Sequence, residues 1–205
     1  MKLYEFEGKK LFEKYEIAVP ESALISERTP VHAIAYPVVL KAQVRSGGRK
    51  KAGGVLFADD AVSCAQQAKE LFEKEFQGER AEKILVEPKI DITAEYYASI
   101  SYDTNMRAPV LALSAEGGIE IDAAKTFPID IIFGVPVFFV REALRRAGFQ
   151  AEDVSGLIPI IQKLWQLFIK EYALLAEINP LVKTKTGTFV ACDAKIILDL
   201  SLIHI

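Results

Sequence analysis

Cysteine and histidine are scarce in this sequence. Among 205 residues there are two of each. The thiols Cys64 and Cys192 are too few for a disulfide scaffold or a four-cysteine zinc site, and they fit a reducing cytoplasm. The histidines, His32 and His204, do not have the spacing of metal ligands, so we assign neither a role. Nothing in these counts requires a cross-link or a metal to hold the fold together.

Long hydrophobic runs and an excess of one charge are also missing. The densest apolar stretch, 129–140, is interrupted by Asp130, Gly134 and Pro136 and is far shorter than the roughly 20 residues of a membrane-spanning helix. The first ten residues alternate charged and apolar side chains, unlike a signal or transit peptide. A net charge of -3 argues against nucleic acid as the main partner. The composition predicts a soluble globular protein of the cytoplasm, with no membrane partner.

Helical and strand patterns are interspersed along the chain. Apolar periodicity predicts helices over 3–15, from 59 to about 76 and over 154–170, with apolar stripes made by Tyr4, Leu11, Phe12 and Tyr15, by Ala61, Ala65, Ala68 and Phe72, and by Leu157, Ile161, Leu164 and Phe168. Apolar or alternating runs predict strands over 38–44, 84–87, 96–102, 110–113, 174–178 and 189–197. Segments 96–102 and 110–113 should form a hairpin, and Pro180 should interrupt the strand that precedes it. The fold class is therefore α/β or α+β, without repeats or a flexible linker.

A glycine-dense basic loop follows the strand that contains Lys41. The loop contains glycines at 47, 48, 53 and 54, which can adopt positive φ and expose backbone N–H groups. Arg49, Lys50 and Lys51 add positive charge. This composition suits a polyphosphate, although the order of residues is not that of a Walker A loop. A solvated basic turn is the alternative interpretation.

Oxygen-bearing side chains gather near the end of the chain. Glu177 and Asn179 are two residues apart on a predicted strand, so they share a face. A hairpin turning at Gly187 would bring Asp193 close to Asn179. A carboxylate and an amide oxygen suit Mg²⁺, which keeps phosphate and water as its other ligands. The alternative is that Asn179 belongs to an Asn-Pro turn and Asp193 is solvated.

Several other side chains have less specific patterns. Glu87 ends a predicted strand and Glu95 lies eight residues further on, where either could accept hydrogen bonds or simply be exposed. Cys64 and Cys192 lie among apolar residues, which predicts core positions for both. Trp165 is predicted to pack on its helix.

Six ordered segments carry a resemblance to a known family. They are L-Y-E-F-E-G-K-K-L-F-E-K-Y (3–15), V-L-K-A-Q-V-R-S-G-G-R-K-K-A-G-G-V (39–55), I-L-V-E (84–87), S-A-E-G-G-I-E-I (114–121), A-E-I-N-P-L-V (176–182) and D-A-K-I (193–196). In this order they resemble the NDP-forming acyl-CoA synthetases, and among these the β subunit of succinyl-CoA synthetase (succinate-CoA ligase). The resemblance covers residue 1 to about residue 198 and corresponds to the ATP-grasp portion of that subunit.

The resemblance implies a two-lobed ATP-grasp fold around a nucleotide cleft. The main lobe would comprise 1–20 and 91–199, and the smaller lobe 21–90. It also implies a role for each matching residue: Lys41, Gly48, Arg49 and Lys50 at the nucleotide phosphates, Glu87 and Glu95 at the base and ribose, Ile90 at the base through its backbone, and Asn179 and Asp193 on Mg²⁺.

In the family, a phosphoryl group passes between ATP or ADP and a histidine of a partner α subunit, which also carries the CoA site. The phosphohistidine then drives formation of succinyl-CoA in the tricarboxylic acid cycle. Glu177 resembles the glutamate that steadies the visiting histidine loop. Neither His32 nor His204 matches the phosphorylated histidine, so this chain should not be phosphorylated itself.

The chain departs from the family pattern in three places. Lys50 stands where the family has glycine. Pro20 resembles the ATP-using type, although GTP remains an alternative. Residues 200–205 resemble an atypical tail, and the family's C-terminal CoA-ligase domain is expected to be absent, so this portion alone should be inactive as a ligase.

Other functions are compatible with the same residues. A related synthetase acting on acetate, malate or citrate is the main alternative, and a non-catalytic ATP-grasp module is another. Nucleic-acid binding by 41–51 is disfavoured because the basic patch is short and lacks interleaved aromatic residues.

Overall fold

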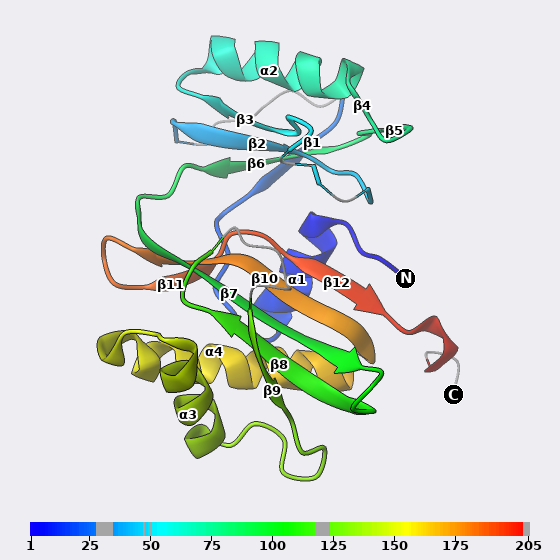
Figure 1. Ribbon diagram of the computed structural model, residues 1–205. Helices are drawn as coiled ribbons and strands as arrows, with labels where there is room; N and C mark the ends of the chain where they lie inside the picture. Colours follow the sequence, from blue (N-terminus) through cyan, green and yellow to red (C-terminus); the bar gives the residue numbers. More distant parts are fainter. Residues whose placement is uncertain (28–34, 47, 50, 118–123, 203–205) are drawn as a thin grey trace. The chain divides into compact units, whose positions relative to one another are not determined.

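The computed structural model describes residues 1–27, 35–46, 48–49, 51–117 and 124–202. Its internal contacts divide the chain into two compact units, which we call unit 1 (1–19 with 91–205) and unit 2 (20–90). The sequence placed the domain boundaries after residues 20 and 90. The two units are described separately below (Figure 1).

Unit 1 contains a six-stranded antiparallel sheet in the order β11-β10-β7-β8-β9, with β12 also paired to β10. The strands are β7 (Ile92–Asp103), β8 (Ala108–Ser114), β9 (Lys125–Pro128), β10 (Ala173–Thr184), β11 (Phe189–Ala191) and β12 (Lys195–Leu198). The helices are α1 (Glu5–Lys14), α3 (Val137–Ala147), α4 (Ala151–Lys170) and a 3-10 turn, η2 (Leu200–Leu202). Unit 1 therefore has a mixed α+β architecture.

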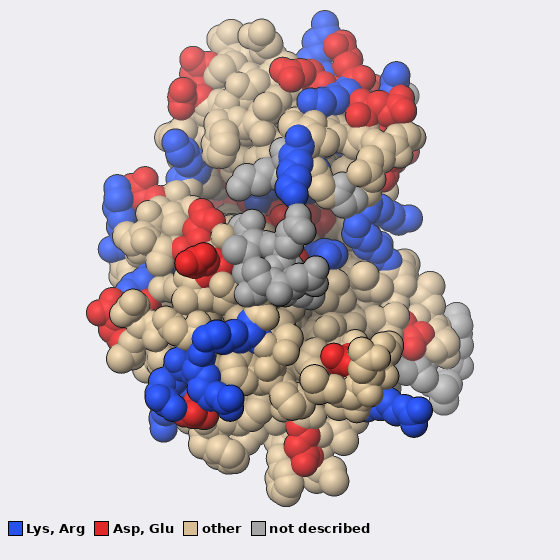
Figure 2. Space-filling view, viewed as in Figure 1, with Lys and Arg blue, Asp and Glu red and all other residues tan. Residues whose placement is uncertain are grey.

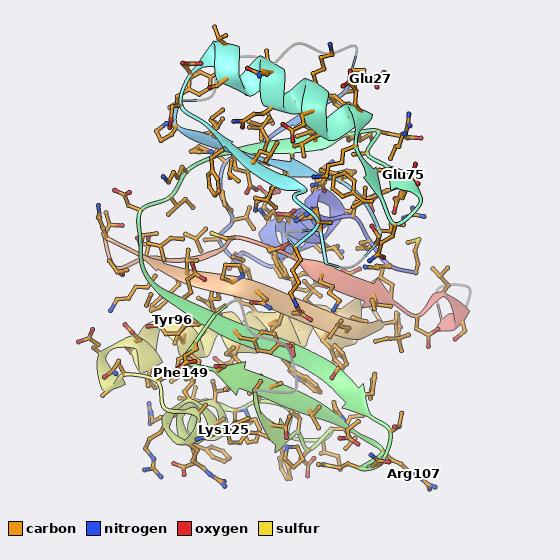
Figure 3. All side chains as sticks on the ribbon, turned by 45° about the horizontal axis from the view of Figure 1, so that its top comes forward. Glu27, Glu75, Tyr96, Arg107, Lys125 and Phe149 are labelled. Carbon is orange, nitrogen blue, oxygen red and sulfur yellow. The ribbon has the colours of Figure 1, made fainter. Side chains whose placement is uncertain are left out.

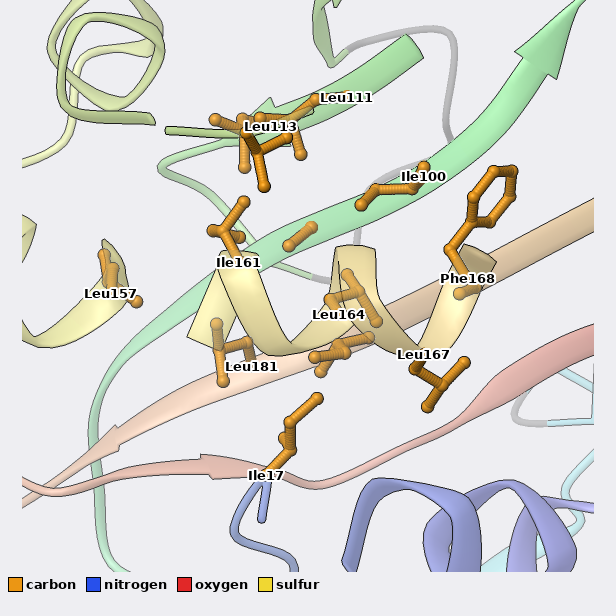
Figure 4. Close-up of a cluster of buried hydrophobic side chains, with 14 of the residues drawn as sticks. Ile17, Ile100, Leu111, Leu113, Leu157, Ile161, Leu164, Leu167, Phe168 and Leu181 are labelled. Atoms are coloured by element: carbon orange, nitrogen blue, oxygen red, sulfur yellow. The ribbon is translucent and has the colours of Figure 1, made fainter. Parts of the chain in front are cut away.

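The core of unit 1 lies between α4 and the sheet. The four predicted apolar positions of α4, Leu157, Ile161, Leu164 and Phe168, are all buried. Figure 4 shows these side chains directed toward Ile100, Leu111, Leu113 and Leu181 of the strands. Trp165 stacks on Phe168 with 5.9 Å between the ring centroids, which confirms its packing role. The 3.6-residue periodicity of this segment thus correctly predicted the face on which the helix packs.

The end of the chain differs from the prediction at Pro180. A single strand, β10, passes through this residue, and its pairing register with β7 shifts between Ile178 and Leu181. Proline has no N–H to donate, and the shift places it where the ladder is already interrupted. The predicted strand 189–197 is instead split into β11 and β12 by residues 192–194. Cys192 therefore lies between strands and is half-buried, so its predicted core position was wrong.

Helix α1 contains a buried ion pair that the apolar stripe did not predict. Glu5 and Lys9 are not part of the predicted apolar stripe, but both are buried and their side chains form a 2.9 Å ion pair. They lie four residues apart, which brings oppositely charged side chains together on one face of a helix. Gly8 lies on the same helix, and a Cβ at this position would be 3.0 Å from that of Ala194. The small residue therefore allows α1 to approach the segment before β12.

Helix α3 was missed by the sequence pattern. Its first turn, Val-Phe-Phe-Val, is continuously apolar and has no helical period. The boundary signals were present, because Pro136 is the N-cap residue and Gly148 ends the helix with φ +91°. None of the helices among the described residues is long and apolar enough to cross a membrane.

Unit 2 is a four-stranded antiparallel sheet in the order β1-β6-β2-β3 with a helix, α2, against it. Its elements are β1 (Ala23–Ile25), β2 (Val38–Ala42), β3 (Val55–Ala58), α2 (Ala61–Glu73), the short hairpin β4 (Glu75–Phe76) and β5 (Glu79–Arg80), and β6 (Ile84–Pro88). Asp60 caps α2 by accepting a 2.8 Å hydrogen bond from the N–H of Ser63.

The buried stripe of α2 is only partly the predicted one. Ala68 is buried and Phe72 packs against the core as predicted, but Ala61 and Ala65 are exposed, and Cys64 and Leu71 complete the buried face. Alanine is compatible with either side of a helix, so the larger Leu71 and the thiol determine the face that packs. The core position predicted for Cys64 is confirmed.

We expect Gly156→Ala to destabilise the protein by about 1 to 3 kcal/mol, although alanine is the better helix former. A Cβ at this position of α4 would lie 2.5 Å from Cε2 of Phe189 on β11. Denaturant titration followed by circular dichroism measures the free energy of unfolding. Ser155→Ala, at the exposed neighbouring position, is the control. An unchanged or increased stability of Gly156→Ala would show that Phe189 gives way without cost.

Candidate functional site

A buried ion pair joins two of the predicted binding residues in unit 2. Val38, Leu40 and Ala42 of β2 belong to the core beneath α2, so the alternation of the strand directs Lys41 to the opposite face. Glu87 of β6 lies on that face too, because it is directly opposite Val39, two residues from Lys41. The Nζ of Lys41 is 2.8 Å from Oε2 of Glu87, and the two side chains are 10% and 1% exposed. Glu87 is therefore not an ordinary exposed glutamate at a strand end.

The glycine-dense loop connects β2 to β3. Gly48 and Gly53 have φ values of +72° and +70°, which confirms at these positions the conformation that glycine permits. Gly54 was also expected at positive φ and is not, but a Cβ there would lie 2.9 Å from Cε1 of Phe76. The reason for glycine at this position is therefore close packing. Lys50, the predicted phosphate ligand that departs from the family pattern, lies outside the described residues, as do His32, His204 and Gly118 of the S-A-E-G-G-I-E-I segment.

Arg49 folds back toward the strand that precedes the loop. Its Nη1 donates a 2.9 Å hydrogen bond to the carbonyl of Ala42, at the end of β2. Within the loop, the N–H of Gly54 donates to the carbonyl of Arg49 at 2.8 Å, and that of Ala52 to Gly48 at 3.0 Å. This guanidinium thus has a structural contact in addition to any contact with a ligand.

Asn179 and Asp193 face each other across β10 and the segment between β11 and β12. Glu177 is paired with Lys195 on one side of them and Leu181 with Ala191 on the other, so the intervening positions remain in register. The 3.0 Å hydrogen bond from the N–H of Cys192 to the carbonyl of Pro180 continues this register. The hairpin predicted to turn at Gly187 is therefore present, and its register sets Asn179 opposite Asp193.

Glu177 lies beside Asn179 in a partly polar environment. It is 8% exposed, and its Oε2 lies 3.3 Å from Nζ of Lys195. Its direct neighbour on β7 is Ser99, which is fully buried and accepts a 2.9 Å hydrogen bond from the hydroxyl of Tyr97. Burial raises the pKa of Tyr97, and the carboxylate of Glu177 raises it further, so the phenol stays protonated as a donor.

This polar group lies on the face of the sheet opposite α4. Ala98 and Ile100 of β7, and Ala176 and Ile178 of β10, belong to the core cluster that α4 joins. Side chains of the intervening residues therefore point the other way. The sequence pattern had not singled out Tyr97, Ser99 or Lys195. The period-two spacing of Lys195 from Asp193 was the one available signal.

Two further predicted binding residues lie close in sequence to residue 90, where unit 2 ends. Ile90 is half-buried in the segment between β6 and β7, and Glu95 is an exposed residue of β7 opposite Val182. Gly117 approaches Glu95 closely, since a Cβ on Gly117 would lie 2.5 Å from the Cβ of Glu95. The S-A-E-G segment therefore contacts the strand that presents Glu95.

Asn179 and Asp193 offer oxygen atoms as possible metal ligands. Among the described residues there is no cluster of three or more His, Cys, Asp or Glu side chains suited to a metal. The amide of Asn179 and the carboxylate of Asp193 form a smaller set, which fits Mg²⁺ because this ion keeps several water or phosphate ligands. On the face displayed in Figure 2, acidic and basic side chains of the described residues are interspersed.

Comparison with known proteins identifies the fold of this chain. A family model described as ATP-grasp domain matches residues 2–183. The chain belongs to the ATP-grasp family. The interspersed helices and antiparallel sheets agree with the predicted α+β class.

Two curated relatives, one from an archaeon and one from a bacterium, match nearly the whole chain. The chain is 42% identical to succinate–CoA ligase [ADP-forming] subunit beta of Methanocaldococcus jannaschii, over 97% of this chain and 57% of the relative. It is 36% identical to the protein of the same name from Bacteroides thetaiotaomicron, over 97% of this chain and 56% of the relative. The chain thus spans little more than half the length of the curated relatives that it matches.

A solved structure supports the fold. An acetyl-coenzyme A synthetase 1 of Ca. Korarchaeum cryptofilum, described in complex with coenzyme A and with a phosphorylated phosphohistidine segment, has a TM-score of 0.75 at 19% identity. The match covers 97% of this chain and 93% of that one. At this identity the likeness concerns the ATP-grasp fold only.

Proposed function

We propose that this chain is the nucleotide-binding part of the β subunit of an ADP-forming succinate–CoA ligase. It would bind Mg-ATP or Mg-ADP and support phosphoryl transfer to and from a histidine of a separate α subunit. The observation that carries the proposal is the register that sets Asn179 opposite Asp193, two residues along the strands from the Glu177 and Lys195 pair. The 42% identity to a relative of that name supports succinate as the acid over acetate, malate or citrate.

Each residue would have a separate task in this reaction. Lys41 and the backbone of the loop at Gly48 and Arg49 would neutralise and orient phosphate oxygens, and Lys50 is proposed there from its position in the motif. Glu87, Glu95 and the backbone at Ile90 would hold the ribose and base. These roles need no covalent residue in this chain, because phosphoryl transfer depends mainly on positioning and on neutralising charge.

Asn179 and Asp193 would hold Mg²⁺, which supplies charge neutralisation for the phosphates when it is bound. Glu177 would accept a hydrogen bond from the visiting histidine loop of the α subunit. Its 3.3 Å ion pair with Lys195 limits the rotation of the carboxylate. We also propose a cytoplasmic location, which the two free thiols support.

We expect Asp193→Ala to weaken Mg-ADP binding at least about 10-fold, as loss of a residue that supports a metal typically does. The effect should depend on the metal, so that binding of ADP in EDTA is equal in the variant and the wild type. Isothermal titration calorimetry measures both constants. Asp59→Ala replaces an exposed carboxylate of unit 2 and is the control. Absence of binding by the wild type at millimolar Mg-ADP would contradict the proposed function.

A further inference from the structure

The short hairpin of β4 and β5 has no role in the proposed function, yet it contacts the glycine-dense loop. Gln77 and Gly78 form its turn with φ values of +52° and +85°. Two successive positive φ values are typical of a tight type I′ hairpin. The register pairs Phe76 with Glu79, so the turn determines the position of the Glu79 backbone. Figure 3 shows the hairpin, with Glu75 labelled, next to the end of α2.

Glu79 binds two successive residues near the start of the loop. Its Oε2 accepts hydrogen bonds from the backbone N–H of Arg45 at 2.9 Å and of Ser46 at 3.2 Å, and Oε1 is 3.1 Å from the N–H of Arg45. Arg45 and Ser46 follow β2 shortly after Lys41. A carboxylate that binds two successive N–H groups fixes the direction of the chain there, because both donors must point at one anion.

The same hairpin also supports the other end of the loop. A Cβ on Gly54 would lie 2.9 Å from Cε1 of Phe76, and a Cβ on Gly53 would lie 2.6 Å from Nζ of Lys74. Phe76 is buried in the core cluster beneath α2, and Lys74 lies over its ring at 5.9 Å from the centroid. Both ends of the loop therefore contact the segment from Lys74 to Glu79, which Phe76 anchors in the core.

The hydrogen bonds of Glu79 restrict the conformation of the loop more than they stabilise the fold of unit 2. Arg45 is exposed, so water could satisfy its N–H if the carboxylate were absent. Glu79 and Arg45 are 34 residues apart in the sequence. Their hydrogen bonds hold the N–H of Arg45 in one direction, whereas water would accept from it in many. Their main consequence is a restricted loop, and a loop that already has its binding conformation loses less entropy when a ligand binds.

We propose that Glu79 is a positioning residue that holds the entry of the glycine-dense loop in the conformation that receives nucleotide phosphate. This inference rests on the proposed function only for the identity of the ligand. Glu79 does not itself contact phosphate, since its carboxylate would repel it. It acts through the backbone of Arg45 and Ser46.

Limited trypsin digestion tests the positioning without any nucleotide. Arg45, Arg49 and Lys51 are cleavage sites within the loop or at its entry. We expect Glu79→Ala to be cut there several-fold faster than the wild type and Glu79→Gln, which keeps one acceptor oxygen, at an intermediate rate. Glu75→Ala, an exposed residue of the same hairpin, should match the wild type. Equal cleavage of all four proteins would overturn the proposal.

Calorimetric titration then tests the consequence for phosphate. We expect Glu79→Ala to weaken Mg-ADP binding about 10-fold, the loss corresponding to one hydrogen bond to a charged group, and adenosine binding to stay the same. A general loss of folding would weaken both ligands and lower the melting temperature, and Glu79→Gln would then supply the comparison. Faster cleavage with unchanged ADP affinity would overturn the role in phosphate binding. A wild type that binds no Mg-ADP contradicts the proposed function, whereas the digestion still decides whether Glu79 holds the loop.

Discussion

Replacing Lys41 with alanine is expected to lower the free energy of unfolding by about 3 to 5 kcal/mol and to weaken Mg-ADP binding by about 10- to 100-fold. The loss of stability follows from burial. The carboxylate of Glu87 is 1% exposed and would be left without the ammonium 2.8 Å away. The loss of affinity follows from the removal of a cation that we place at the nucleotide phosphates.

A double replacement separates these two effects. Lys41→Met combined with Glu87→Leu removes both charges, and well-packed apolar side chains often match or exceed the stability of a buried ion pair. We expect stability to return to within about 1 to 2 kcal/mol of the wild type, because volume-conserving apolar packing is tolerated. Nucleotide binding should remain weak, because neither residue can contact phosphate or ribose.

Urea titration and calorimetry measure these two quantities. The control is Lys69→Ala, which replaces a lysine of α2 whose side chain is 77% exposed. Recovery of Mg-ADP affinity in the double variant would show that Lys41 serves the stability of unit 2 and not the ligand.

The second large effect is expected at the N-terminus of α4. Asp153→Ala should destabilise the protein by about 3 to 5 kcal/mol, the usual cost of breaking a buried ion pair from one side. The carboxylate of Asp153 is 4% exposed, lies 2.5 Å from Nζ of Lys183 on β10 and accepts a hydrogen bond from the hydroxyl of Tyr96 on β7. Figure 3 shows Tyr96 next to Phe149, whose ring lies 5.1 Å away between centroids. One side chain therefore connects α4 to the two central strands of unit 1.

The same network predicts how stability depends on pH. Burial by itself raises the pKa of Asp153, but hydrogen bonds from Lys183 and Tyr96 outweigh it, so the folded-state pKa lies below the usual value. The unfolded chain consequently binds the proton at a higher pH. The stabilisation is complete above the unfolded pKa of about 3.9 and is lost as the pH falls through the lower folded value.

Urea titrations at several pH values between neutral and acidic conditions test this dependence. Asp153→Ala should lose less stability than the wild type as the pH falls. Glu152→Ala is a matched control, because Glu152 contacts the same lysine at 3.0 Å but is 76% exposed, and it should behave like the wild type. If the free energy of unfolding changed with pH equally in the wild type and in Asp153→Ala, the lowered pKa of Asp153 would not be the cause of the pH dependence.

The sequence predicted the elements whose pattern depends on local burial. The buried positions of α4 and the strands β2, β6, β7 and β8 were correct, because each has one face toward a core and a regular period. Helix α3 and strands β1, β3, β4, β5 and β9 were missed. They are short or continuously apolar, and long-range contacts rather than periodicity determine their conformation.

Some features of the candidate site could be predicted from the sequence and others could not. Spacing around a turn at Gly187 brought Asn179 opposite Asp193, and glycines at positions 48 and 53 have the predicted positive φ. Glu79 could not be predicted from its sequence position. It reaches the loop only because the turn at Gln77 and Gly78 folds the chain back over a contact that spans more than 30 residues.

The sequence by itself determined the α+β class, the order of the motifs and the residue types available for binding phosphate and Mg²⁺. These follow from composition, period and spacing, which act over a few neighbouring residues. Only the tertiary structure decided that Lys41 pairs with Glu87, that Glu177 lies beside Lys195, and that Glu79 binds the loop entry. The physical reason is that strand register and hairpin geometry place these partners, and both are set by packing between segments distant in the sequence.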